Sequence, residues 1–189
     1  MTDFDGDAEL TDYVRAHFAA SGQTKRDFAA ESAGELVEVA RSLAAALDGG
    51  GKLLLCGNGG SAADCQHIAA EFVSVLTQDF QRRALPAIAL TTDSSFLTAR
   101  TNDFGFDDVY ARQIEALGKS GDVLFGISTS GNSTSVLHAV EAAHAMQITT
   151  VGLTGRSGGA LKDAVDRALQ APSDNVQHIQ ECHIAMGHV

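Results

Sequence analysis

The chain has 189 residues, of which 44% are hydrophobic and 20% charged, and its formal net charge is −11. This composition predicts a soluble globular chain of one ordinary domain. An acidic chain is a poor partner for nucleic-acid phosphates, and no apolar run approaches the roughly 18 residues that cross a bilayer. We therefore expect neither a nucleic-acid nor a membrane partner.

The cysteines Cys56, Cys65 and Cys182 are odd in number and widely spaced. Such a pattern does not predict a disulfide framework and is typical of a reducing compartment. The acidic N-terminus lacks the basic start and apolar run of a signal peptide. These features together predict a cytoplasmic protein.

The first fifty residues predict helices. Apolar residues at helical spacing indicate one helix over 8–20 and a second over 32–47, which the glycines at 49–51 end. Both helices carry more apolar residues than one solvent-facing layer needs. We interpret them as helices that contact other subunits of an oligomer.

From residue 51 onward, short apolar runs alternate with helical segments. The predicted strands lie at 52–56, 86–91, 122–127, 149–153 and 166–171. The predicted helices lie at 62–76, 107–117, 136–146 and from about 175 to the end. This alternation predicts an α/β fold with a doubly wound, parallel five-stranded sheet and helices on both faces. We expect a single domain over 1–189, with helices in 1–50 and the α/β core in 51–189.

Two loops of small residues follow predicted strands and lead into helices. They are GNGGS at 57–61 and STSGNS at 128–133. Both lie at the carboxyl edge of a parallel sheet, where glycines, hydroxyls and free helix N–H groups can bind a phosphate. Either loop alone could be an ordinary capped turn, but the two together favour a phosphate site. Neither loop matches a dinucleotide or P-loop motif, so no nucleotide cofactor is predicted.

Polar residues on two predicted helices suggest further chemistry. His67 and Glu71 are four residues apart and share a helix face with Asp64. This spacing suits a metal pair, an acid/base pair or a surface ion pair. The last helix holds a second polar cluster: Gln177, His178, Gln180, Glu181, His183 and His188. The pair Asn102-Asp103 by itself indicates a turn.

Several long motifs, in order, resemble the phosphoheptose isomerases of the SIS (sugar isomerase) family. They are GNGGSAADCQHIAAEF (57–72), LPAIALTTDSSFLTARTNDFGFDDVYARQIEALG (85–118), GDVLFGISTSGNS (121–133), TVGLTGRSGG (150–159) and IQECHIAMGH (179–188). The resemblance implies a flavodoxin-like fold and a homotetramer with active sites between subunits. It also implies an aldose–ketose isomerase that converts sedoheptulose 7-phosphate to D-glycero-D-manno-heptose 7-phosphate through an ene-diol.

The resemblance implies roles for individual residues as well. The substrate-binding positions are Asn58, Gly59, Gly60, Ser61, Glu71, Asn102, Asp103, Ser128, Thr129, Ser130, Ser133 and Gln180. The ligands of one zinc ion per subunit are His67, Glu71, Gln180 and His188. Glu71 and His188 also match the pair that moves protons, and the sequence does not decide which of them acts at carbon.

Several alternatives remain open. Gln180 and His188 are eight residues apart, about 12 Å along a helix, so spacing alone favours His183 as the zinc ligand. Cys65 and Cys182 could be zinc ligands, although small core residues are the simpler interpretation. A non-catalytic SIS protein of the replication-initiator-associating type would keep the loops without the acid/base pair. An isomerase of another ketose phosphate would keep both.

Overall fold

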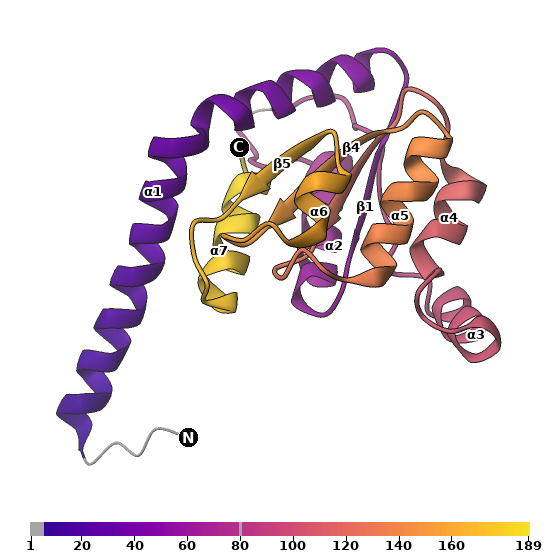
Figure 1. The fold of residues 1–189 in the computed structure, drawn as a ribbon. Helices are drawn as coiled ribbons and strands as arrows, with labels where there is room; N and C mark the ends of the chain where they lie inside the picture. The colour runs from indigo at the N-terminus through magenta and orange to yellow at the C-terminus, as the bar shows by residue number, and fades with distance from the viewer. Residues whose placement is uncertain (1–5, 80) are drawn as a thin grey trace.

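The computed structural model describes residues 6–79 and 81–189 (Figure 1). At its centre is a five-stranded sheet of β1 (Leu53–Gly57), β2 (Ala87–Ala89), β3 (Val123–Ile127), β4 (Thr149–Thr154) and β5 (Arg167–Gln170). The strand order is β2-β1-β3-β4-β5, and every pairing is parallel. The predicted parallel sheet is therefore confirmed, and its order is that of flavodoxin-like, doubly wound folds.

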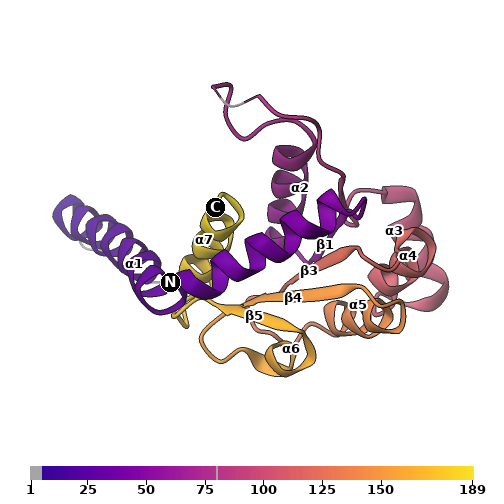
Figure 2. The same cartoon turned by 90° about the horizontal axis from the view of Figure 1, so that it is seen from above.

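Helices cover both faces of the sheet (Figures 1 and 2). One face carries α1 (Asp7–Asp48), α2 (Gly60–Val73) and α7 (Val176–Gly187). The other carries α4 (Val109–Leu117), α5 (Thr134–Ala145) and α6 (Gly159–Ala164). Alternate residues of β1 point to the two layers, so that Leu53 and Leu55 pack in one core cluster and Leu54 and Cys56 in the other.

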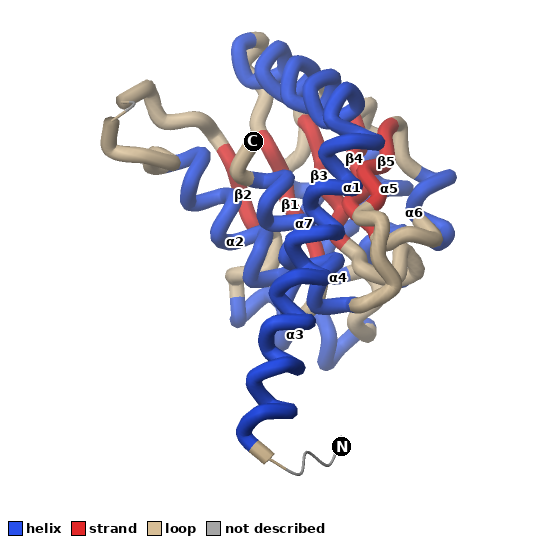
Figure 3. The backbone as a smooth tube through the Cα atoms, turned by 90° about the vertical axis from the view of Figure 1, so that its left-hand side faces the viewer, coloured by secondary structure: helices blue, strands red, loops and turns tan. Residues whose placement is uncertain are grey.

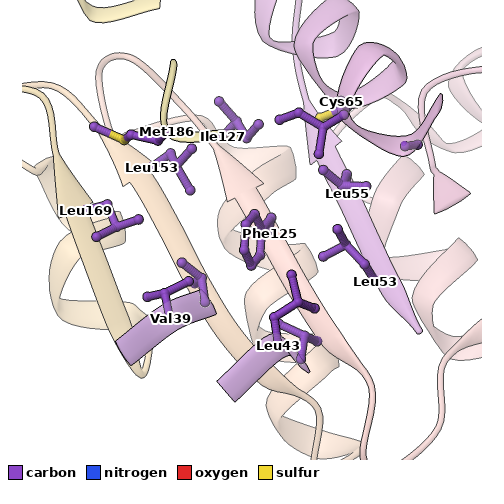
Figure 4. Close-up of a cluster of buried hydrophobic side chains, with 14 of the residues drawn as sticks. Val39, Leu43, Leu53, Leu55, Cys65, Phe125, Ile127, Leu153, Leu169 and Met186 are labelled. Carbon is purple, nitrogen blue, oxygen red and sulfur yellow. The ribbon is translucent and has the colours of Figure 1, made fainter. Parts of the chain in front are cut away.

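The strands β1 and β3 are buried along their whole length. A strand that is covered on both faces has a continuous run of apolar residues in its sequence. That pattern predicted β1 and β3. In Figure 4, Val39 and Leu43 of α1 lie over the sheet near Phe125. The second half of α1 is therefore part of the core, and burial of a side chain such as Leu43 contributes about 2 kcal/mol.

A single helix of 42 residues, α1, replaces the two helices predicted for 8–20 and 32–47. The predicted interruption was wrong because tertiary contacts hold the polar middle of the helix. Thr24 and Phe28 are buried there, and Ser21 donates a hydrogen bond to Glu181 of α7. The N-terminal half of α1 runs beside α7 and projects beyond the sheet (Figures 1 and 3). Residues 1–5, which precede the helix predicted for 8–20 within the segment 1–50, lie outside the described residues.

Two short helices were not predicted, α3 (Ser94–Phe104) and α6. The helix α3 contains Asn102 and Asp103, so the turn predicted there was wrong. Its start is capped by Asp93, whose side chain accepts a hydrogen bond from the backbone N–H of Phe96. No residue of α3 is buried, which explains why no apolar periodicity indicated it. Within the described residues, no helix has the length and hydrophobicity needed to cross a bilayer.

Candidate active site

The loops that follow β1 and β3 begin side by side. Gly57 and Ile127 are partners in the register of the two strands, so Asn58 and Ser128 start adjacent loops. The chain continues from β1 to β2 on one side and then returns to β3 on the other. This is the topological switch point, where doubly wound sheets form a ligand-binding crevice. The structure thus brings the two small-residue loops together.

The turn at 128–133 gathers hydroxyl groups at one place. Ser128 Oγ lies 3.1 Å from Ser133 Oγ and 3.4 Å from Ser130 Oγ. Ser133 is the N-cap residue of α5, yet its side chain makes no capping hydrogen bond. The N-terminal end of α5, with its partial positive charge, is therefore left open to an anion.

Gly131 lets this turn pack directly against the loop after β4. Its φ is +67°, and a Cβ at this position would come within 1.9 Å of the Gly158 carbonyl oxygen. Asn132 Oδ1 accepts a hydrogen bond of 3.0 Å from the Ala160 N–H. The close backbone contact and this side-chain bond fix the conformation of the hydroxyl-rich turn.

Asn58 joins the first loop to two helices. Its Nδ2 donates to Ser135 Oγ at 3.0 Å, and its Oδ1 lies 3.0 Å from the Tyr110 hydroxyl. The same hydroxyl lies 2.6 Å from the Gly57 carbonyl oxygen, and burial raises the pKa of Tyr110, so it stays protonated as a donor. The sequence pointed to Asn58 but not to Tyr110 or Ser135, because nothing distinguishes these two from other helix residues.

The helices α2 and α7 lie side by side and run in the same direction (Figure 2). Gly60 abuts Gln180 at their beginnings, and Gly187 abuts Ile68 further along. A Cβ on Gly60 would lie 1.9 Å from Gln180 Nε2, so this glycine makes room for the Gln180 amide. Burial raises the pKa of the adjacent Asp64 carboxyl, and the Gln180 hydrogen bond opposes that shift. Asp64 therefore interacts with both Gln180 and His67.

Further along the same two helices, three of the predicted residues meet. His67 Nε2 lies 3.0 Å from His188 Nε2 and 3.6 Å from Glu71 Oε1. Glu71 Oε2 is buried and has no hydrogen-bond partner among the described residues. His183 instead faces the sheet, fully buried, with Nε2 2.9 Å from the Thr154 carbonyl oxygen. Burial lowers the pKa of His183 to about 4, so its ring is neutral at pH 7.

Among the described residues, no hydrogen bond or ion pair joins this group to the hydroxyl-rich turn. Glu71 follows Gly60 by eleven residues, about 16 Å along α2. The Gln180 amide contacts Gly60 at the beginning of α2, whereas His188 contacts His67 in its second half. Of the four predicted zinc ligands, Gln180 is therefore apart from His67, Glu71 and His188 in this structure. In the part of the chain that the structure describes, no three His, Cys, Asp or Glu side chains already form a metal-binding cluster.

The remaining predicted residues lie elsewhere. Asn102 Nδ2 donates to Asp103 Oδ1 at 2.8 Å on the exposed helix α3, and no hydrogen bond among the described residues joins this pair to either group. Cys65 and Cys182 are buried in the core, as the simpler interpretation predicted. Burial raises the pKa of the Cys182 thiol to about 11, so this thiol remains protonated at pH 7.

A flavodoxin-like sheet with a hydroxyl-rich turn at its switch point is the arrangement of a phosphosugar-binding domain. Residues 16–155 match the family model of the SIS domain. The chain is 53% identical to phosphoheptose isomerase from Roseiflexus sp. (strain RS-1) over 180 residues, which cover 95% of this chain and 90% of that relative.

Two solved structures agree with this match. A phosphoheptose isomerase from Neisseria gonorrhoeae has a TM-score of 0.89 and 45% identity, with 95% of each chain covered. One from Francisella tularensis has a TM-score of 0.90 and 38% identity, with 95% of this chain and 94% of that chain covered. The chain belongs to the phosphoheptose isomerase family of SIS-domain proteins and is an isomerase of sugar phosphates.

Proposed function

We propose that the protein converts sedoheptulose 7-phosphate to D-glycero-D-manno-heptose 7-phosphate through an ene-diol. The observation that carries this proposal is that His67 lies 3.0 Å from His188 and 3.6 Å from the Glu71 carboxylate. An aldose–ketose isomerisation needs a base at carbon and a second group that moves protons between two oxygens. A carboxylate and an imidazole are suitable for these two tasks.

The substrate phosphate binds to the turn at 128–133. The hydroxyls of Ser128, Thr129, Ser130 and Ser133 and the open end of α5 supply neutral donors, which suits a chain with a net charge of −11. The sugar hydroxyls are contacted by residues of the first loop and of α3 and α7: Asn58, Gly59, Gly60, Ser61, Asn102, Asp103 and Gln180. The phosphate thereby holds the reacting carbons at a fixed distance from the turn.

Glu71 and His188 move the protons. One of them removes the proton from the carbon beside the carbonyl group, and the other transfers a proton between O1 and O2 of the ene-diol. The buried Glu71 Oε2, which has no partner among the described residues, is a suitable proton acceptor. The base then returns its proton to the neighbouring carbon, which completes the conversion of ketose to aldose.

We also propose that zinc binds to His67, Glu71 and His188, and that the Gln180 side chain, which contacts Gly60 in this structure, turns toward them to become the fourth ligand. Tetrahedral zinc with bonds of about 2.0–2.1 Å holds its ligand atoms about 3.3–3.4 Å apart. His67 Nε2 lies 3.0 Å from His188 Nε2 and 3.6 Å from Glu71 Oε1, close to that ligand–ligand distance. Imidazole nitrogens and carboxylate oxygens are common zinc ligands. When bound, the ion would stabilise negative charge on the substrate oxygens.

The active site is proposed to lie between subunits of a homotetramer. Glu71 lies in the second half of α2, about 16 Å along that helix from Gly60, and a second copy can place its own Glu71 opposite the phosphate turn. The projecting half of α1 exposes Leu10, Val14 and Phe18 by 44%, 51% and 73%. Contiguous apolar surface of this kind is typical of a protein interface. We further propose one SIS domain over 1–189, located in the cytoplasm, where three free cysteines stay reduced.

The test is an isomerase assay on sedoheptulose 7-phosphate with wild type, Glu71→Gln and His188→Gln. Loss of a general acid or base lowers kcat by about 100-fold to 10,000-fold, so we expect both variants to fall in that range. Wild-type turnover in both variants would remove this mechanism. A parallel assay on a ketohexose phosphate distinguishes an isomerase of another ketose, and an inactive wild type would favour a non-catalytic SIS protein.

A further inference from the structure

The guanidinium group of Arg82 lies against the C-terminal end of α2, the helix that carries His67 and Glu71. Its Nη2 donates to the Glu71 carbonyl oxygen at 2.7 Å, and its Nη1 donates to the Phe72 carbonyl oxygen at 2.9 Å and reaches that of Ser74 at 3.5 Å. The last carbonyls of an α-helix have no partner inside the helix. One side chain from outside the helix therefore satisfies several of them.

Glu71 occupies an electrostatically unfavourable position. It is the third residue from the end of α2, where the helix dipole leaves a partial negative charge that disfavours a carboxylate and favours a cation. The last turn of α2 contains no basic residue. Arg82, which lies in the segment before β2, places a positive charge at this helix end. Its planar guanidinium group can donate hydrogen bonds to two adjacent carbonyl oxygens at once, which a lysine ammonium group cannot do in the same geometry.

The same segment is fastened to the helix at a second point. The Leu85 N–H donates to the Phe72 carbonyl oxygen at 3.0 Å. Arg82 Nη1 also donates to the carbonyl oxygen of Arg83 at 2.9 Å, which closes the segment on itself. The end of α2 and the segment before β2 thus form one hydrogen-bonded unit, with the Arg82 guanidinium at its centre.

The neighbouring Arg83 has different surroundings. Its side chain is 57% exposed and pairs with Asp48 Oδ1 at 3.1 Å, where the Asp48 side chain is 82% exposed. Exposed pairs of this kind contribute little to stability. Because Arg83 is adjacent, has the same charge and directs its side chain to Asp48, outside the unit at the helix end, it provides a matched control for Arg82.

We propose that Arg82 is a positioning residue for the isomerisation, holding the last turn of α2 so that the Glu71 carboxylate meets His188 and the substrate. This inference rests on the proposed function of Glu71. Arg82 acts through the backbone and not through the phosphate turn, so its loss lowers kcat and leaves KM nearly unchanged. Displacement of a catalytic group by about 1 Å lowers the rate by on the order of 100-fold.

The first experiment compares Arg82→Gln, Arg82→Lys and Arg83→Gln in the assay on sedoheptulose 7-phosphate. We expect kcat to fall by about 10-fold to 100-fold in both Arg82 variants, with KM within about threefold of wild type. Arg83→Gln should match wild type in both constants. The lysine variant keeps the positive charge but loses the paired hydrogen bonds of the guanidinium group. Wild-type kcat in either Arg82→Lys or Arg82→Gln would overturn the positioning role.

A double-variant cycle tests whether Arg82 acts through Glu71. In the Glu71→Gln background, Arg82→Gln should lower kcat little further, because residues that act as one unit are not additive. Fully multiplied losses would contradict the inference. Wild-type kcat in Glu71→Gln alone would instead overturn the proposed function, whereas a slow Glu71→Gln beside a normal Arg82→Gln would overturn only the role of Arg82.

Amide hydrogen exchange provides a measurement that does not depend on turnover. The amides of residues 70–76 should exchange faster in Arg82→Gln than in wild type or Arg83→Gln, because the helix end has lost its external partners. Equal exchange in all three proteins would show that the guanidinium does not hold this turn, and would overturn the inference.

Discussion

The backbone of Gly60 and the side-chain amide of Gln180 are in direct contact, so closely that a Cβ on Gly60 would lie 1.9 Å from Gln180 Nε2. This contact sets the beginning of α7 against the beginning of α2. It also places Gln180 beside Asp64, from which α2 continues toward His67. The glycine-rich loop therefore has a packing role toward α7 in addition to its place beside the phosphate turn.

Replacement of Gly60 by alanine should displace the Gln180 amide. Because the contact distance leaves no space for a methyl group, we expect kcat/KM to fall by at least about 10-fold, the scale of a misplaced contact group. The control is Gly34→Ala on α1, where an added Cβ meets no atom within 4 Å and the helix gains stability. Wild-type kcat/KM in Gly60→Ala would show that the position of Gln180 does not matter for turnover.

Mixed oligomers should recover activity if each active site draws on two subunits. Ser133→Asp places a carboxylate where the phosphate binds, and aspartate remains a good N-cap residue for α5. Glu71→Gln removes the proposed base. Neither variant should be active alone, whereas subunits co-expressed and assembled together should combine an intact turn with an intact Glu71. An inactive mixture, with mixed assembly verified by differently tagged subunits, would place all of these residues in one chain's site.

Zinc content should depend on the group at the second half of α2. Purified wild type is expected to contain about one zinc ion per subunit by elemental analysis, and His67→Gln should contain much less, because loss of one ligand weakens tetrahedral zinc binding. A suitable control is His138→Gln, since His138 pairs with Asp108 at 2.8 Å on the other face of the sheet. Equal zinc content in the three proteins would contradict the proposed ligand set.

Acid should destabilise the fold through His183. Burial lowers its pKa from 6.5 to about 4, so between these values the unfolded chain binds more protons than the folded one. The free energy of unfolding therefore falls as the pH drops from about 6.5 toward 4, by up to about 3 kcal/mol. Thermal denaturation at several pH values measures this. His183→Gln, which keeps a donor for the Thr154 carbonyl but does not titrate, should show a weaker pH dependence, and an unchanged dependence would exclude His183 as its source.

Much of the fold was predictable because the relevant signals are local. The apolar runs that became β1 and β3 are continuous, and the loops after them are rich in glycine and hydroxyl groups. Local patterns wrongly predicted a break in α1 at residues 21–31, where the apolar periodicity is interrupted. Contacts with α7, such as the hydrogen bond from Ser21 to Glu181, maintain the helix there. Local patterns also failed for α3, which buries no residue and so lacks the periodicity that indicates a helix.

The candidate site was predictable in its residue types but not in its grouping. Spacing within α2 put His67 and Glu71 on one face, and the family resemblance named His188. Spacing within α7 favoured His183 instead, and only the packing of α7 on the sheet shows that His183 faces Thr154. Arg82 gave no signal, because its partners are backbone carbonyls at the end of a helix that finishes nine residues earlier, at Val73.

The amino-acid sequence by itself determined the alternating strands and helices, the two small-residue loops and the membership of a sugar-phosphate isomerase family. These depend on patterns within a few residues or on motifs preserved in order. The tertiary structure alone decided that His67 meets His188 across 121 positions, that Gln180 lies at the other end of α2, and that α1 is continuous. Contacts between helices depend on how two surfaces far apart in the chain fit together, and no local pattern records that fit.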